Sequence, residues 1–145
     1  MSDNLRRYRA IRDALIQGYP GQPTGTVARH VTTLAAMISG IVGSKSTQLP
    51  HIATKVPDGT QAESRVKRFA RWVRNDKITA AVYFVPYAKV LLTQLALQTL
   101  VLVIDGSVVG RGCVALMIQV VYKGRPLPVA WLVRAGKKGH FPEDW

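Results

Sequence analysis

The sequence predicts an α/β protein, and within this chain the elements follow an α+β order, helices first and strands afterwards. Two patterns support this. Up to residue 76, apolar residues recur at the three- and four-residue spacing of amphipathic helices. After residue 100, apolar and β-branched residues form continuous runs that end at turn residues, as strands do. The shift in composition indicates a boundary near residues 77–85, so we assign residues 1–76 to a helical domain and residues 77–145 to a second domain.

The chain is strongly basic. Its 145 residues include 20 Lys and Arg against 8 Asp and Glu, a formal net charge of +12. This indicates nucleic acid as the first choice of partner and an anionic membrane surface as the second. Cys113 is the single cysteine, which excludes an intrachain disulfide. The charged N-terminus is unlike a secretion signal, and Pro86 and Lys89 interrupt the most apolar stretch. We therefore expect a cytoplasmic protein without a membrane segment.

The first predicted helix covers Ser2–Gln17, with apolar residues near one face. A break rich in glycine and proline follows at residues 18–23. The arginines of this helix fit either a solvated face or an arm that contacts phosphates: Arg6, Arg7, Arg9 and Arg12.

The second predicted helix covers Thr24–Val42 and begins at a threonine cap, Thr24 or Thr26. Gly40 and Gly43 are expected to mark its end, because glycine is common just after a helix. The expected core face follows helical spacing and comprises Val27, Val31, Leu34, Ala35, Ile38 and Val42.

A short helical element at Leu49–Val56 and a turn at residues 57–59 lead to the clearest helix of the chain. Thr60 to Glu63 match a capping box, in which the Thr60 hydroxyl accepts a backbone hydrogen bond and Glu63 reaches back. The apolar stripe of this helix comprises Val66, Phe69, Trp72 and Val73, and residues 75–77 end it.

The same helix contains a dense set of cations. We predict that they contact DNA: Arg65, Lys67, Arg68, Arg71 and Arg74. Glu63 and Asp76 lie only at the helix ends, so pairing within the helix cannot neutralise its middle. A helix, a short helix and a basic helix follow the order of a helix-turn-helix-like bundle, whose last helix lies against DNA. The alternative is a basic face that only meets solvent.

The second domain begins with a helix expected from Pro86 to about Gln98. The stretch LVLVIDGSVVG at Leu100–Gly110 then predicts a central strand that is buried on both faces. A loop at residues 110–112 precedes the strand Cys113–Tyr122. A turn at residues 123–126 joins this strand to Leu127–Val133 in an antiparallel hairpin. A basic loop covers residues 135–140, and residues 141–145 read as the start of another helix.

Asp105 follows the most apolar strand directly. A buried carboxylate needs a partner, and a metal ion is a strong one, so Asp105 is a candidate catalytic residue and metal ligand. The alternative is an aspartate that caps the following turn. His30 has no second His or Cys at ligand spacing, and we interpret it as structural.

Four stretches, in this order and spacing, resemble the N-terminal part of an insertion-sequence transposase of the DDE class. They are SRVKRFARWVRN at Ser64–Asn75, LVLVIDGS at Leu100–Ser107, the hairpin at Ala115–Val133 and KKGHF at Lys137–Phe141. The resemblance runs from about Thr24 to the last residue. It implies a helical DNA-binding domain followed by a ribonuclease-H-like core, of which this chain contains the first three strands.

The resemblance also implies transposition activity, in which the ends of a transposable element are bound, cut and joined by two-metal phosphoryl transfer. Asp105 matches the first of three acidic residues that hold two divalent ions, Mg²⁺ or Mn²⁺, in each complete site. Glu143 and Asp144 match neither of the other two. We therefore expect a truncated chain that is inactive in catalysis by itself.

The partners implied by the resemblance are double-stranded DNA, at the element ends and at the target, and further copies of the chain assembled on DNA. A nucleoid-associated location follows. The alternative is a non-catalytic DNA-binding protein or an inhibitor of transposition. A basic RNA-binding protein would have the same charge but no reason to place Asp105 after so apolar a strand.

Overall fold

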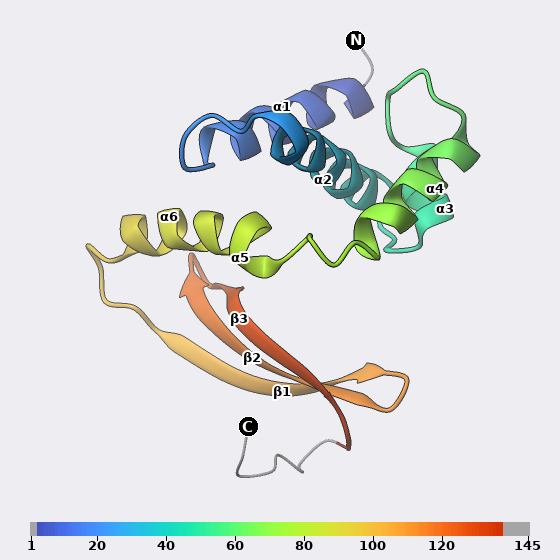
Figure 1. Ribbon diagram of the computed structural model, residues 1–145. Helices are drawn as coiled ribbons and strands as arrows, with labels where there is room; N and C mark the ends of the chain where they lie inside the picture. Colours follow the sequence, from blue (N-terminus) through green and yellow to red (C-terminus); the bar gives the residue numbers. More distant parts are fainter. Residues whose placement is uncertain (1–2, 138–145) are drawn as a thin grey trace. The chain divides into compact units, whose positions relative to one another are not determined.

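The computed structural model describes residues 3–137, which form two compact units (Figure 1). The helical unit extends to Val90, and the sheet unit begins at Leu91. The sequence placed the boundary earlier, after residue 76. Residues 77–90 stay with the helical unit because the hydroxyl of Tyr83 lies 2.6 Å from Nδ1 of His30. In addition, the hydroxyl of Tyr87 donates to the carbonyl of Leu15 at 3.0 Å.

The described helices are α1 (Asp3–Gln17), α2 (Gly25–Ser44), α3 (Leu49–Thr54), α4 (Ala62–Val73), α5 (Ala80–Tyr83) and α6 (Val85–Leu95). Apart from α5, which the sequence did not predict, the helices form close to where their periodicity predicts them. Pro86 lies in the first turn of α6, where its missing N–H has no helical partner to lose. In the helical unit, α2 packs against α1, α3 and α4.

The core of the helical unit lies among α2, α3 and α4. Its buried residues are Ala36, Met37, Ile52, Ala53, Val56 and Phe69, and Tyr8 of α1 packs against them. Val31 and Ala35 are buried as expected. Val42 and Val73 were also predicted to be core but are 55% and 60% exposed. Val42 is exposed because α3 and α4 contact the side of α2 that contains Ala36 and Gly40. Val73 is the last residue of α4 and lies outside the core cluster.

Gly40 and Gly43 lie inside α2 and do not end it, contrary to the sequence prediction. The helix continues to Ser44 and ends at Lys45, whose φ of 53° is left-handed and whose N–H bonds to the carbonyl of Ile41. Gly40 serves packing instead. A Cβ atom at that position would lie 2.7 Å from the carbonyl oxygen of Ile52. The absent side chain therefore lets α3 approach the backbone of α2 closely.

The capping box predicted at Thr60 does not form. The N-cap of α4 is Gln61, and its side chain makes no capping hydrogen bond. The backbone N–H of Thr60 instead donates to Oδ1 of Asp58 at 3.2 Å. A carboxylate is a stronger acceptor than a hydroxyl, so Asp58 organises the turn before α4.

The sheet unit is a three-stranded antiparallel sheet in the order β1-β2-β3, within the described residues. Its strands are β1 (Leu102–Gly110), β2 (Cys113–Tyr122) and β3 (Arg125–Ala135). Arg111 and Gly112 join β1 to β2, and Lys123 and Gly124 join β2 to β3. All four have positive φ angles, between 49° and 74°. Two positive φ angles match the twist of tight hairpins, so both connections are short turns.

The apolar run that was predicted to be a central buried strand lies at an edge of the described sheet. β1 pairs only with β2, and the central strand is β2. The residues of the run are 40–68% exposed: Leu100, Val101, Leu102, Val103 and Ile104. The prediction was wrong for the described residues because burial needs elements on both faces, and the sequence pattern does not supply them.

The observed class is α+β, as predicted for this chain: helices followed by an antiparallel sheet. None of the helices within residues 3–137 combines the length and the hydrophobicity needed to cross a bilayer. Residues 138–145 lie outside the described residues. They include the end of the predicted basic loop, the KKGHF stretch after Lys137 and the predicted helix start at residues 141–145.

Candidate nucleic-acid interface

The five cations predicted to contact DNA divide into two sets on α4. Lys67, Arg71 and Arg74 are exposed. Their spacing of four and three residues places them on one stripe of the helix. Together with Ala70 they line a shallow surface depression. Nε of Arg71 also donates to the carbonyl of Lys67 at 3.4 Å. We name Lys67, Arg71 and Arg74 the outer stripe of α4.

Arg65 and Arg68 form the second set and turn toward the residues that precede α4. Arg65 has a side chain only 12% exposed. Its Nε donates to Oδ1 of Asp58, its Nη2 to the Asp58 carbonyl at 2.6 Å and its Nη1 to the Ala53 carbonyl at 2.5 Å. All three nitrogens of this guanidinium therefore have partners inside the protein, and Arg65 holds α3, the turn and α4 together.

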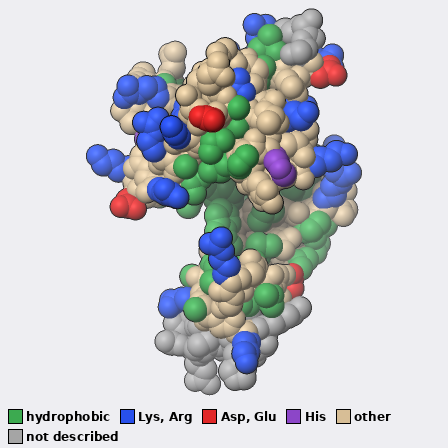
Figure 2. All heavy atoms as spheres, turned by 90° about the vertical axis from the view of Figure 1, so that its right-hand side faces the viewer, with side chains coloured by type: hydrophobic (Ala, Val, Ile, Leu, Met, Phe, Trp, Pro, Cys, Tyr) green, Lys and Arg blue, Asp and Glu red, His purple; other side chains and the backbone are tan. Residues whose placement is uncertain are grey.

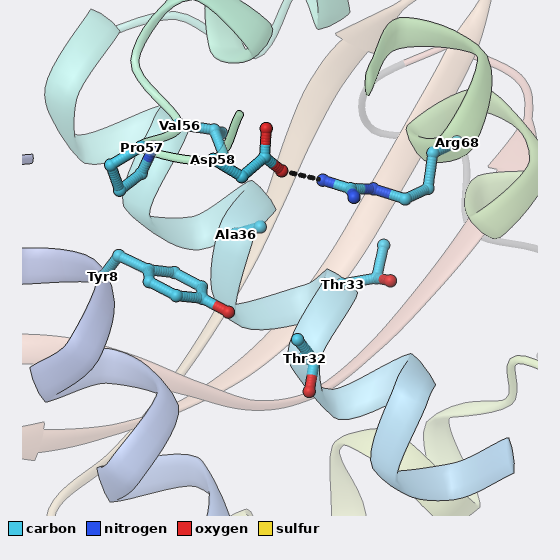
Figure 3. A pocket seen from close by; sticks show the side chains of 8 residues that line it. All are labelled: Tyr8, Thr32, Thr33, Ala36, Val56, Pro57, Asp58 and Arg68. Atoms are coloured by element: carbon cyan, nitrogen blue, oxygen red, sulfur yellow. Dashed lines mark hydrogen bonds and ion pairs between the residues drawn. The ribbon is translucent and has the colours of Figure 1, made fainter. Parts of the chain in front are cut away.

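Arg68 donates from Nη2 to Oδ2 of Asp58 at 2.8 Å (Figure 3). Burial alone would raise the pKa of Asp58, but the hydrogen bonds from Arg68 and Arg65 outweigh it and hold that pKa below its ordinary value. Among the described residues, no ion pair within α4 neutralises its middle, as the sequence predicted, but two of its arginines pair with an acid outside the helix. Sequence reasoning considered Glu63 and Asp76 on the helix and overlooked an acid in the preceding turn.

Asp58 and Arg68 border a small cavity of about 60 Å³ between the helices (Figure 3). Tyr8 of α1, Thr32 and Thr33 of α2 and the turn before α4 supply the rest of its wall. The cavity is too small for a ligand of any size beyond a water molecule or two. At the wall of this cavity, the hydrogen bond from Arg68 to Asp58 holds the Arg68 side chain in place.

A larger groove of about 360 Å³, which is also lined by Arg68, lies between α2 and α4. Its lining comprises Thr26, Arg29, His30, Thr33, Arg68, Arg71, Trp72 and Asn75. Among these described lining residues, three are arginines and none is acidic. Figure 2 likewise shows Lys and Arg side chains over one face of the helical unit, with few acidic ones among them. The outer stripe and the groove share Arg71 and thus form one basic surface.

The two walls of the groove are tied together by hydrogen bonds. Nε1 of Trp72 donates to the carbonyl of His30 at 3.2 Å. The His30 ring is bonded to the hydroxyl of Tyr83, and the Trp72 ring meets Tyr83 edge to face. Burial raises the pKa of Tyr83, which therefore keeps its proton at neutral pH. The contacts of His30 agree with the structural role predicted for it.

Sequence reasoning missed Arg29 and Asn75. Helical periodicity places Arg29 on the exposed side of α2, but no sequence pattern shows that this side borders α4. Asn75 follows α4 and was interpreted only as the end of the helix. Asn75 is close to Arg71 because it follows α4 by two residues, whereas Arg29 shares the groove because α2 packs against α4.

Asp105 lies in the middle of β1 and is exposed, whereas the sequence predicted a strand end in a buried site. Gly106 and Ser107 continue the strand and do not form a turn, so Asp105 does not cap one either. Oγ of Ser107 donates to Oδ2 of Asp105 at 2.9 Å. In the register of the sheet Asp105 is opposite Met117, and Met117 is opposite Trp131.

The described residues do not by themselves complete a magnesium site. Mg²⁺ in proteins is held by more than one oxygen ligand besides its waters. In the described part of the chain there is no group of three His, Cys, Asp or Glu residues able to hold a metal ion. Asp105 is the only acidic residue in the described portion of the sheet unit. It fits one position of such a site and no more.

Comparisons with protein-family models, with curated proteins and with solved structures found no match to this chain.

Proposed function

We propose that the helical unit binds double-stranded DNA and that the outer stripe of α4 contacts the phosphate backbone. One observation carries this proposal: Lys67, Arg71 and Arg74 are exposed on one stripe, beside a groove whose described lining has three arginines and no acid. Arg65 is left out of the interface, because its nitrogens are already bonded to Asp58 and Ala53.

The charge of this surface explains why a phosphate backbone is the favoured partner. Each cation placed on a phosphate releases condensed counterions, and log K falls with log [salt] by about 0.9 for each contact. Contacts from all three residues of the outer stripe would thus contribute about 2.7 to the salt slope. Phosphate contacts fix position without reading sequence, so the proposal covers binding and not recognition of a particular site.

The proposal rests on the surface of α4 and not on a recognised motif. A helix-turn-helix joins its two helices by a turn of about three or four residues. Here residues 55–61 separate α3 from α4. A helix-turn-helix-like docking of α4 in the major groove is one way to bring the outer stripe to DNA, and the experiment below tests the stripe itself.

The test is a titration of the full chain against a short DNA duplex at several salt concentrations, followed by fluorescence anisotropy. Lys67→Ala combined with Arg74→Ala should weaken binding and lower the salt slope by about 2. Lys89→Ala is the control, because Lys89 is exposed on α6 away from this stripe. A double variant with the slope of the wild type would refute the interface.

We further propose that the chain is the N-terminal part of a DDE-class transposase, with the sheet unit as the first three strands of a ribonuclease-H-like core. The apolar character of β1 and the presence of an acidic side chain, Asp105, on that strand support this. In this proposal Asp105 is the first acidic ligand of a two-metal site for Mg²⁺ or Mn²⁺. Two more acids are required, and the described residues do not contain them. Assembly of several copies on DNA belongs to the same proposal.

The isolation of Asp105 favours a second candidate, a non-catalytic DNA-binding protein or an inhibitor of transposition. The two candidates differ in a nicking assay on supercoiled DNA with Mg²⁺. A chain that binds DNA without nicking it agrees with the second candidate. Nicking that is abolished by Asp105→Asn, with binding retained, would establish the first.

A further inference from the structure

We propose that the groove between α2 and α4 binds a single phosphate of the DNA backbone, held from α2 by Arg29 and from α4 by Arg71. This inference rests on the proposed DNA binding and adds a residue, Arg29, and a defined contact to it. The residues concerned come from helices that are far apart in the sequence and share one groove.

The first argument is charge. Arg29, Arg68 and Arg71 line the groove, and no acidic side chain is among its described lining residues. Arg68 is paired with Asp58 on its far side, but Arg29 and Arg71 have no ion pair with an acid in the described residues. Two cations that line one groove without a counter-charge repel each other, and an anion bound between them removes that cost.

The second argument is the set of hydrogen-bond donors. Nη2 of Arg29 donates to Oγ1 of Thr26 at 3.0 Å, which holds the guanidinium against α2 and leaves its other N–H groups for an anion. Oδ1 of Asn75 accepts from the N–H of Lys77 at 3.0 Å, so the donating NH₂ group of that amide is the part available to a ligand. Guanidinium forks and amide donors match the oxygens of a phosphate.

Arg68, which also lines the groove, supplies a third observation. Nε of Arg68 is buried and has no hydrogen-bond acceptor among the described residues. A buried donor without a partner costs free energy, and a small outward turn of the guanidinium would present it to an oxygen in the groove. Asp58 anchors the same guanidinium through Nη2, so this cation stays close to the groove when the site is empty.

The aromatic contacts explain why the ligand is a phosphate and not a stacked base. Trp72 donates its N–H to His30 and packs edge to face on Tyr83, with ring centroids 6.1 Å apart. The indole is thereby used to join α2, α4 and α5. What remains toward the groove is chiefly cationic and polar, which suits the backbone of a duplex.

The experiment extends the anisotropy titration to Arg29→Ala, Arg71→Ala and the variant that combines them. Arg29 lies outside the residues tested by the outer-stripe variant, so the two tests are independent. We expect Arg29→Ala to weaken duplex binding about tenfold at low salt and to lower the salt slope by about 1. Lys89→Ala, which removes the same charge elsewhere, should change the affinity less than about twofold. Circular dichroism confirms that each variant is folded.

The double variant tests whether both arginines hold the same phosphate. If they do, either substitution alone removes most of the contact, and the combined loss is smaller than the product of the two separate losses. A combined loss equal to that product would overturn the shared site. An Arg29→Ala variant that binds DNA like Lys89→Ala, while the wild type binds tightly, would also overturn it and leave the outer-stripe proposal intact.

Inorganic phosphate offers the same oxygens as DNA and must be distinguished from it. The chain is therefore titrated with phosphate at constant ionic strength and followed by thermal denaturation. Stabilisation that needs Arg29, together with an unchanged DNA affinity of Arg29→Ala, would assign a free-anion site and refute a DNA contact. Failure of the wild type to bind duplex at all would instead refute the proposed function on which this inference rests.

Discussion

Gly40 of α2 provides the sharpest test of how the helical unit is packed. It lies inside the helix, four residues before the last residue of α2, and is buried against α3. A Cβ atom added there would overlap Cγ2 of Ile52 and lie 2.7 Å from the Ile52 carbonyl oxygen and 3.2 Å from its carbonyl carbon. The side chain of Ile52 can rotate, but its backbone can move only if α3 shifts as a whole.

Two effects of Gly40→Ala oppose each other. Alanine in a helix interior is favoured over glycine by about 1 kcal/mol. Overpacking of a well-filled core costs about 1–3 kcal/mol and sometimes more, and contact with backbone belongs at the upper end of that range. We expect a net loss of about 1–2 kcal/mol, which corresponds to a decrease in Tm of about 4–16 °C for a unit of this size.

The assay is thermal and urea denaturation of the full chain, followed by circular dichroism at the helix signal. Gly43→Ala is the matched control, since it makes the same helix-propensity gain three residues later in α2. Its new Cβ would lie 3.2 Å from Cβ of Lys55 and would meet the end of the Arg7 side chain. That side chain can move aside without a shift of backbone, but only by giving up its hydrogen bonds to Ser39 and Asn4. If Gly40→Ala is as stable as Gly43→Ala or the wild type, the close α2–α3 approach is not a feature of the protein.

Two further predictions concern the turn before α4 and the hairpins. The folded-state pKa of Asp58 is lowered, so its stabilising effect is complete above its unfolded pKa of about 4 and is lost as the pH falls through the folded value. Asp58→Asn should therefore cost about 1–2 kcal/mol at pH 7 and should flatten the acid side of the stability profile measured by urea titration. An unchanged profile would show that the ion pairs of Asp58 with Arg65 and Arg68 contribute nothing to the free energy of unfolding. Lys123→Asn should stabilise the sheet unit by about 0.5 kcal/mol, measured by thermal denaturation. Lys123 has a φ of 49° before Gly124, and asparagine adopts that left-handed conformation more readily than lysine. A destabilised variant would contradict this turn geometry.

Much of the secondary structure could be predicted from the sequence because it depends on local patterns. The helical spacing of apolar residues such as Val31 and Ala35 indicates a helix regardless of what those residues contact. The glycines at residues 112 and 124 indicate tight turns. The same local evidence was insufficient for glycine, because glycine has more than one structural role. Glycine ends many helices, but Gly40 lies inside one and allows Ile52 of α3 to pack against the backbone of α2. This role depends on α3 and cannot be read from the sequence around Gly40.

The candidate site shows the same division. The sequence by itself determined that the chain is basic, that α4 concentrates its cations and that one aspartate follows a run of apolar residues. The tertiary structure decided which cations are accessible, since Asp58 holds Arg65 and Arg68 while Lys67, Arg71 and Arg74 stay exposed. It also brought Arg29 to the groove. Charge and periodicity can be counted along a chain, but pairing between side chains depends on distances in space, which only the packing of α2, α3 and α4 sets.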